Sequence, residues 1–148
     1  MFETRRISSD VDPSVKRADT ATGFAEGTAD VTLNSHHLTL APAASNLTLS
    51  GGITGTGNLT LGATGAGTIT LQTSPINNTG TITNNGTGTA STTITSVIGA
   101  NVTGLVQNSA TSTLILSTTA NTYAGGTPIS AGTLQIGTGA NETAAALG

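Results

Sequence analysis

Short apolar–threonine–apolar triplets recur along the chain from Val31 onward. The regular members are Leu38–Leu40, Leu47–Leu49, Leu59–Leu61 and Ile69–Leu71, each with a threonine at its centre. Alternation of period 2 places the two outer residues of a triplet on one face of a strand and the threonine on the other. The pattern therefore predicts an all-β protein made of short strands. Looser members of the series are Ile82, Ile94, Val97–Ile98, Leu105–Val106, Leu114–Leu116, Ile129 and Leu134–Ile136.

The distances between triplets narrow the choice of architecture. Consecutive triplets lie 9 to 12 residues apart, which fits an antiparallel sandwich or barrel, or a solenoid. Every second triplet, however, follows at a nearly constant step. The step is 21 residues from Leu38 to Leu59, 22 from Leu47 to Ile69, 23 from Leu59 to Ile82 and 20 from Leu114 to Leu134. Such a step fits one coil with two or three short strands. We therefore predict a right-handed parallel β-helix (solenoid) of about five to six coils.

Charge divides the chain into two regions. All four basic residues, Arg5, Arg6, Lys16 and Arg17, lie near the N-terminus, where the triplets are missing. We expect residues 1–27 to form a polar, flexible arm and residues 28–148 to form the repeat region. Between positions 31 and 141 there is no Asp, Glu, Lys or Arg. A basic patch for nucleic acid and a carboxylate pair for acid–base catalysis are therefore both excluded from this region.

Few residues in the repeat region are candidates for chemistry. There is no cysteine, and no run of 18 apolar residues predicts a membrane span. His36 and His37 are adjacent, so on a strand their side chains point to opposite faces and do not chelate one metal ion together. We expect no catalytic residue, no metal site and no cofactor.

The abundant threonine and asparagine suggest two surface features. Thr68–Thr70, Thr81–Thr83 and Thr93–Thr95 are Thr-x-Thr elements whose hydroxyl groups face outward on a strand, an arrangement that an ice-binding solenoid would use. Their spacings of 13 and 12 residues are not whole coils, which argues against this alternative. The pairs Asn77–Asn78 and Asn84–Asn85 are candidates for amide ladders between stacked turns.

One segment resembles a known family. Residues 114–137 read LILSTTANTYAGGTPISAGTLQIG and resemble the passenger-associated repeat of autotransporter proteins. Pro128 stands where the family more often has threonine. The matching residues are Leu114, Leu116, Asn121, Thr122, Tyr123, Gly125, Gly126, Ile129, Ala131, Gly132, Thr133, Leu134 and Ile136.

The residues of this motif suit structural roles. Tyr123 is the only aromatic residue of the repeat region, and we expect it to close a coil while its hydroxyl group reaches a turn carbonyl. Gly125, Gly126 and Gly132 would supply the positive φ angles of sharp corners. We also expect an aspartate at Leu134 to destabilise the fold severely, because it would place an unpaired charge in the core.

The resemblance implies a non-catalytic structural or adhesive segment of a passenger displayed at the surface of a Gram-negative bacterium. It implies a longer passenger that ends in a translocator barrel, which these 148 residues do not include. Host-surface or matrix glycans, proteins, or further copies of the chain are the expected partners, with no nucleic acid. Besides ice binding, the remaining alternative is a non-catalytic part of a polysaccharide-acting β-helix protein, since residues 31–141 lack the charged groups that such an enzyme uses.

Overall fold

The described part of the chain is built from short strands alone. A computed structural model describes residues 16–18, 26–118 and 120–137. No helix occurs in these ranges, and so none that is long and apolar enough to cross a membrane. The strands are β1 (Lys16–Ala18), β2 (Glu26–Gly27), β3 (Val31–Thr32), β4 (Leu38–Leu40), β5 (Leu47–Leu49), β6 (Ile53–Thr54), β7 (Leu59–Leu61), β8 (Ile69–Leu71), β9 (Gly80–Asn84), β10 (Thr92–Ile94), β11 (Val102–Asn108), β12 (Leu114–Leu116), β13 (Ile129–Ala131) and β14 (Leu134–Ile136).

The strands form two long parallel sheets and one short one. Sheet A contains β1, β4, β7, β9, β11 and β13 in spatial order, and sheet B contains β2, β5, β8, β10, β12 and β14. Strands β3 and β6 form a third side, face C, which isolated bridges extend from Ile53 to Ile76 and from Ile76 to Ile98. The chain visits sheet A, sheet B and face C in turn. The fold is therefore a parallel β-solenoid of about five turns, as the sequence predicts.

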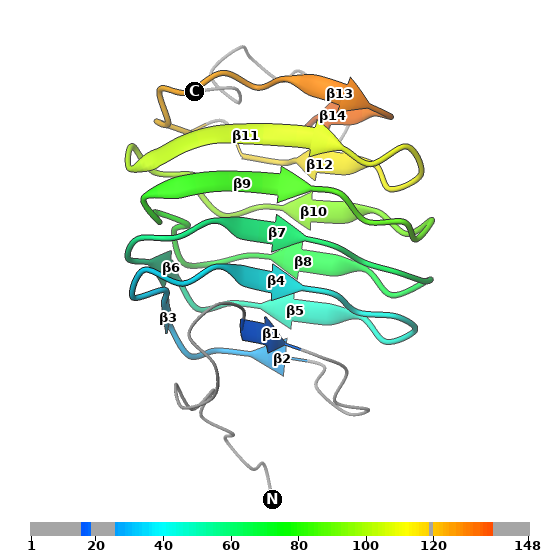
Figure 1. Ribbon diagram of the computed structural model, residues 1–148, viewed down its shortest axis with the longest axis horizontal. Helices are drawn as coiled ribbons and strands as arrows, with labels where there is room; N and C mark the ends of the chain where they lie inside the picture. The colour runs from blue at the N-terminus through cyan, green and yellow to red at the C-terminus, as the bar shows by residue number, and fades with distance from the viewer. Residues whose placement is uncertain (1–15, 19–25, 119, 138–148) are drawn as a thin grey trace, which may run out of the picture.

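Figure 1 shows the direction of winding. Sheet A lies on the near side with its strands running from left to right, while the chain climbs from the N-terminus at the bottom to the C-terminus at the top. A chain that rises in this sense winds to the right, which is the hand that crossovers between parallel strands almost always take.

The predicted stacking of triplets is confirmed residue by residue. Leu38 lies beside Leu59, and Leu59 lies beside Ile82, on sheet A. Leu47 lies beside Ile69, and Leu114 beside Leu134, on sheet B. These register partners are the four pairs that the spacing in the sequence identifies. The distance between every second triplet is thus the length of a coil.

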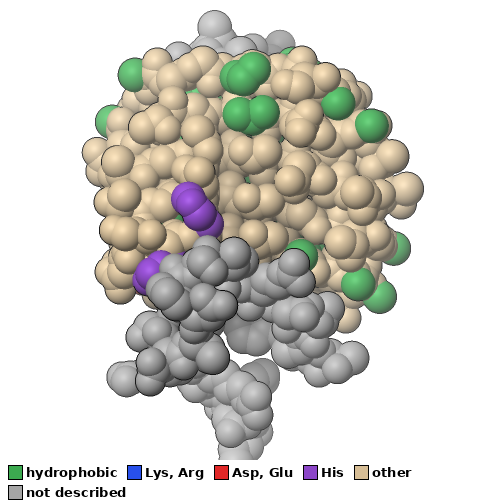
Figure 2. Space-filling view, viewed as in Figure 1, with side chains coloured by type: hydrophobic (Ala, Val, Ile, Leu, Met, Phe, Trp, Pro, Cys, Tyr) green, Lys and Arg blue, Asp and Glu red, His purple; other side chains and the backbone are tan. Residues whose placement is uncertain are grey.

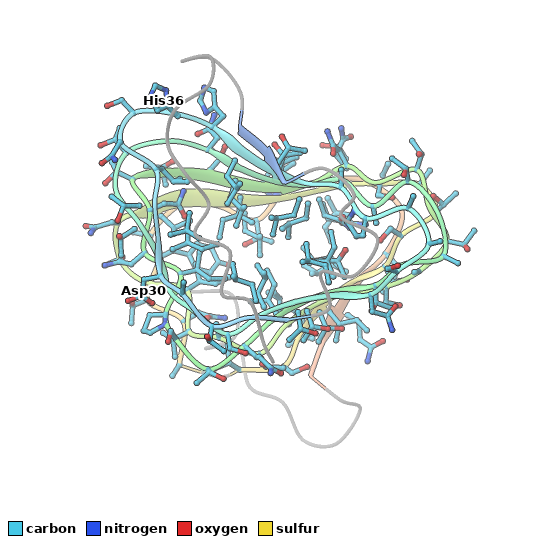
Figure 3. The ribbon with its side chains drawn as sticks, turned by 90° about the horizontal axis from the view of Figure 1, so that it is seen from below. Asp30 and His36 are labelled. Carbon is cyan, nitrogen blue, oxygen red and sulfur yellow. The ribbon has the colours of Figure 1, made fainter. Side chains whose placement is uncertain are left out.

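The core consists of the outer residues of the triplets. In β7, β8 and β12 both outer residues are buried, while the central residue is partly exposed. Ile53, Ile76 and Ile98 close the core from face C and are at most 1% exposed. Figure 3, a view along the solenoid axis, shows side chains of the three sides meeting inside one continuous outline. Burial of stacked apolar rows is the main stabilising contribution that such short strands have available.

Two short segments of the expected N-terminal arm pair with strands of the solenoid. Residues 16–18 form β1 beside β4, and residues 26–27 form β2 beside β5. These short segments carry no apolar triplet. Their pairing provides partners for backbone N–H and C=O groups of β4 and β5, which does not require one. The rest of the arm lies outside the described residues.

Candidate functional site

The passenger-like motif occupies one full circuit of the solenoid. Its first strand, β12, packs Leu114 and Leu116 into the core, both at 0% exposure. Below them lie Thr92 and Ile94 of β10, and above them lie Leu134 and Ile136 of β14. The motif therefore begins and ends in sheet B, one coil apart, and passes through face C and sheet A between these strands.

Tyr123 fills the core at the corner that follows β12. Its side chain is 1% exposed, and it is the largest fully buried side chain of the described residues. Its hydroxyl group lies 2.7 Å from Oγ1 of Thr127. Burial raises the pKa of Tyr123, and the hydrogen bond with Thr127 opposes this shift. The expected closing role is thus seen, but the partner is a threonine hydroxyl group instead of a turn carbonyl.

Asn121 and Thr122 attach this corner to the coil below. The backbone N–H of Ile98 donates to Oδ1 of Asn121 at 2.8 Å. The backbone N–H of Thr122 donates to the carbonyl oxygen of Ile98 at 2.9 Å. Both the N–H and the carbonyl group of Ile98 are therefore hydrogen-bonded to this corner, which places Tyr123 over the core of face C. Because an unpaired buried backbone group is costly, this double contact fixes the height of the corner.

The sequence predicts a positive φ angle at three glycines of the motif, Gly125, Gly126 and Gly132, and only one of them has it. Gly132 has φ +70°, in the turn between β13 and β14. Gly125 has no positive φ, but a Cβ atom there would lie 1.8 Å from the carbonyl oxygen of Thr103, so it allows two backbones to approach closely. Gly126 also has no positive φ, and a Cβ atom there would meet nothing within 4 Å. The prediction is therefore wrong for Gly125 and Gly126.

The last residues of the motif form the top coil and are less enclosed. Ile129 is 55% exposed, and Leu134 and Ile136 are only partly buried against the core. Ala131 ends β13 beside Asn108, and the carbonyl oxygen of Thr133 accepts the N–H of Leu114 at 3.1 Å. Pro128 precedes β13 and uses only its carbonyl oxygen, which accepts the N–H of Gln107. A proline at the entry to a strand fits this position, because it lacks an N–H group.

A second set of contacts joins successive coils and was not predicted. In each, a side-chain acceptor receives a backbone N–H from the adjacent coil, and we call these contacts inter-coil clips. The acceptors are Oδ1 of Asp30, Nδ1 of His37 and Oδ1 of Asn46, Asn58, Asn77 and Asn121; the donors are, in the same order, the N–H groups of Gly52, Asn58, Thr68, Thr81, Asn101 and Ile98. The distances range from 2.7 Å to 3.0 Å. The clips join the corners of adjacent coils, where the hydrogen bonds between paired strands end.

The asparagine pairs do not stack on each other as the ladder hypothesis expects. Asn84 instead points into the core and donates from Nδ2 to Oε1 of Gln107 at 2.8 Å, one coil further along. Nε2 of Gln107 donates to the carbonyl oxygens of Ser109 and Ser112. Asn78 is also buried, and its Nδ2 donates to the carbonyl oxygen of Gly57. Amide side chains thus connect coils, but from inside the core, because alternation turns Asn84 toward it.

The Thr-x-Thr elements alternate between the two long sheets. Thr70 and Thr93 lie in sheet B, whereas Thr83 lies in sheet A. Thr48, Thr70 and Thr93 are in register on three successive coils of sheet B. Each step of 12 or 13 residues leads from one long sheet to the other, which is about half a coil. The spacing of these elements therefore does not argue against stacking, because the elements that stack are two steps apart. The next position in this column is Ile115.

The surface around these columns is almost free of charge. In the stretch 28–137 of the described chain, Asp30 is the only acidic or basic side chain other than the two histidines. The near face in Figure 2 accordingly shows polar and scattered apolar side chains, with histidine toward its lower edge. His37 is exposed, whereas Nδ1 of His36 is buried without a hydrogen-bond partner. No group of three His, Cys, Asp or Glu side chains suited to a metal ion lies within the described ranges.

Comparison with known proteins identifies the circuit built by β12, Tyr123, β13 and β14. Neither the curated proteins nor the solved structures contain a match to the chain. Residues 111–136, which enclose this circuit and lie within a β-solenoid, match the family model of the passenger-associated transport repeat.

Proposed function

We propose that the chain is a non-catalytic structural and adhesive segment of an autotransporter-type passenger, displayed at the surface of a Gram-negative bacterium or released from it. The observation that carries this proposal is that the matched repeat forms one complete coil in register with the coils below it. Its most buried side chains pack in the core or join one coil to the next. A repeat used in this way supports a scaffold role, and its functional surface is then the outside of the solenoid.

The outer surface suits weak contacts with uncharged polar partners. Its strand faces present threonine, serine and asparagine, with almost no charge from residue 28 to residue 137. Such a surface has no electrostatic steering, so contact depends on hydrogen bonds and on many repeated positions. We propose glycans or proteins of a host surface or matrix, or further copies of the chain, as the partners.

Surface display of the whole chain tests the proposal. The 148 residues are joined to an autotransporter translocator in a Gram-negative host, and display is measured by antibody binding and by protease access on intact cells. Adhesion of these cells to plates coated with matrix glycans and proteins is measured alongside. We expect display with adhesion above that of cells carrying the translocator alone. Folded, displayed chain without adhesion to any surface would remove the adhesive role, and absence of display would remove the passenger role.

Ice binding is a second candidate, supported by the in-register column of Thr48, Thr70 and Thr93. Neighbouring coils lie about 4.8 Å apart, so the column holds hydroxyl groups at a regular interval. Sheet A carries an equivalent column of Thr39, Thr60 and Thr83. The test is thermal hysteresis of the purified chain and of the variants Thr70→Lys on sheet B and Thr60→Lys on sheet A. Hysteresis that either variant abolishes supports this function and identifies the sheet that carries it. The absence of hysteresis at millimolar concentration removes it and leaves the scaffold role untouched.

A further inference from the structure

Two of the inter-coil clips depend on groups that gain a proton, and both join the first coils of the solenoid. Asp30 receives the N–H of Gly52 at 2.7 Å, and His37 receives the N–H of Asn58 at 3.0 Å. The clips further along use asparagine, whose amide group does not titrate. The same structural task is therefore given to titratable side chains in only one part of the molecule.

The contact of His37 has a counterpart one coil further along. Leu38, Leu59 and Ile82 are register partners, so the residues that precede them occupy equivalent places on sheet A. Those residues are His37, Asn58 and Thr81. His37 accepts from the N–H of Asn58, and Asn58 accepts from the N–H of Thr81, both at 3.0 Å. The imidazole and the amide thus perform one task at successive steps of one column.

Protonation has a direct consequence for this bond. A neutral imidazole has one acceptor nitrogen, and here it is Nδ1; the protonated ring has two donors and no acceptor. An N–H facing another N–H cannot form the clip, so a protonated His37 must release Asn58. At lower pH, protonation of Asp30 weakens its clip as well, because the charge-assisted bond to Gly52 becomes a neutral one.

Among the described residues, few other charged or titratable groups lie in the strands next to this column. Lys16 and Arg17 are on β1, which pairs with β4, and Glu26 is on β2, which pairs with β5. His36 lies next to His37 in the sequence, and Figure 3 places it and Asp30 at opposite ends of one side of the solenoid. Nδ1 of His36 is buried and makes no hydrogen bond, so this ring holds no clip. Tyr123 belongs to the far coils.

We propose that the junction between the first two coils is acid-sensitive: its two clips are released as His37 and then Asp30 gain protons, while the asparagine clips further along stay closed. In the closed state His37 cannot hold a proton on Nδ1 and keep its bond, whereas in the open state it can. The open state therefore binds more protons, and the stability of this junction falls as the pH falls.

Amide hydrogen exchange in the full chain tests this device. Exchange is followed residue by residue by NMR at pH 8 and pH 5, with correction for the intrinsic rate. We expect the protection of the Asn58 amide to fall by about three- to tenfold at pH 5, the change expected for one hydrogen bond. The Thr81 amide, held by Asn58, should keep its protection. Equal protection of Asn58 at both pH values would overturn the proposal.

Two variants move the acid sensitivity in opposite directions. His37→Asn gives this step the side chain that already works one coil further along, and should leave Asn58 protected at pH 5. Asn58→His should make the Thr81 amide lose protection at pH 5. His36→Asn is the matched control and should behave as the native chain does. A His37→Asn chain that stays acid-sensitive would contradict the assignment to His37.

Failure of a variant to fold does not end the test. In the native chain, the imidazole resonances of His37 and the amide resonance of Asn58 should change with a common midpoint as the pH is lowered. Different midpoints for these two signals would separate the histidine from the clip and overturn the proposal.

Discussion

The side-chain amide of Asn84 donates a 2.8 Å hydrogen bond to Oε1 of Gln107, one coil further along, and both side chains are completely buried. The two residues continue a column of sheet A that contains two leucines, since Asn84 is the register partner of Leu61 and Leu61 is the partner of Leu40. The core thus changes from apolar to polar along this column. Every buried amide nitrogen of the pair has a partner.

Breaking this pair should be more costly than replacing it. Asn84→Leu leaves Oε1 of Gln107 buried without a donor, and we expect it to lower the free energy of unfolding by about 1–3 kcal/mol. In the double variant with Gln107→Leu, two leucines extend the leucine column. We expect the double variant to be at least about 1 kcal/mol more stable than the sum of the two single effects predicts. Urea unfolding of the four chains measures this coupling, and strict additivity would show that the pair does not act as a unit.

A charge in the core should cost more at Leu116 than at Leu134. Leu116 is 0% exposed between β10 and β14, whereas Leu134 lies in the top coil and is only partly buried. We expect Leu116→Asp to cost about 4 kcal/mol or more and Leu134→Asp only about 1–2 kcal/mol, because a partly exposed carboxylate keeps contact with water. The severe loss that the sequence predicts for Leu134→Asp is therefore expected at Leu116 instead, since Leu134 is only partly buried. Melting temperatures of both variants check the order. An equal loss would mean that Leu134 is more enclosed than its exposure indicates.

The adjacent glycines of the motif should respond differently to alanine. In Gly125→Ala the new methyl group would lie 1.8 Å from the carbonyl oxygen of Thr103, so the two coils must separate. We expect a loss of about 2–3 kcal/mol, in the range of overpacked sites. Gly126→Ala meets no atom within 4 Å and should change stability by less than about 0.5 kcal/mol. Thermal unfolding of the two variants, side by side, tests the close approach, which predicts that only Gly125 is sensitive.

Alkaline pH should weaken the far coils through Tyr123. Burial raises the pKa of this phenol above the ordinary value of 10.0. The contribution to stability is therefore complete below pH 10 and is lost as the pH rises through the raised pKa, because the unfolded chain releases its proton first. We expect the melting temperature to fall as the pH rises above about 10.

Tyr123→Phe is the control for this pH dependence. It removes the ionisable group together with the bond to Thr127, so it should cost about 1 kcal/mol at pH 7 and should remove the alkaline decline. A decline of the same size in this variant would assign the effect to other groups.

The architecture was predictable because the triplets encode it directly. Leu38, Leu47, Leu59 and Ile69 each begin an alternating triplet, and the distance between every second one equals the coil length. Apolar alternation specifies which face of a strand is buried, and a one-residue slip would reverse it. The register of the core could thus be derived from the spacing alone.

The polar contacts were not predictable in the same way. Asn84 follows Ile82 and Thr83, so its inward direction is implied by alternation, but its partner Gln107 lies 23 residues further along and shares no pattern with it. The clips of His37 and Asn58 join side chains to backbone groups, which leave no mark in a sequence. The space that requires Gly125 is likewise set by Thr103 of another strand. Each of these contacts depends on the exact geometry of a corner, and periodicity does not specify corners.

The direction of the inter-coil bonds determines how the solenoid responds to tension. The strands run across the axis, and the hydrogen bonds that join one coil to the next run along it. A pull on the two ends therefore loads these bonds a few at a time, and the coils unzip in sequence instead of shearing together. Each released coil of about 22 residues lengthens the chain by roughly 70 Å. Under tension, we therefore expect this solenoid to lengthen in small, repeated steps while its remaining coils stay intact.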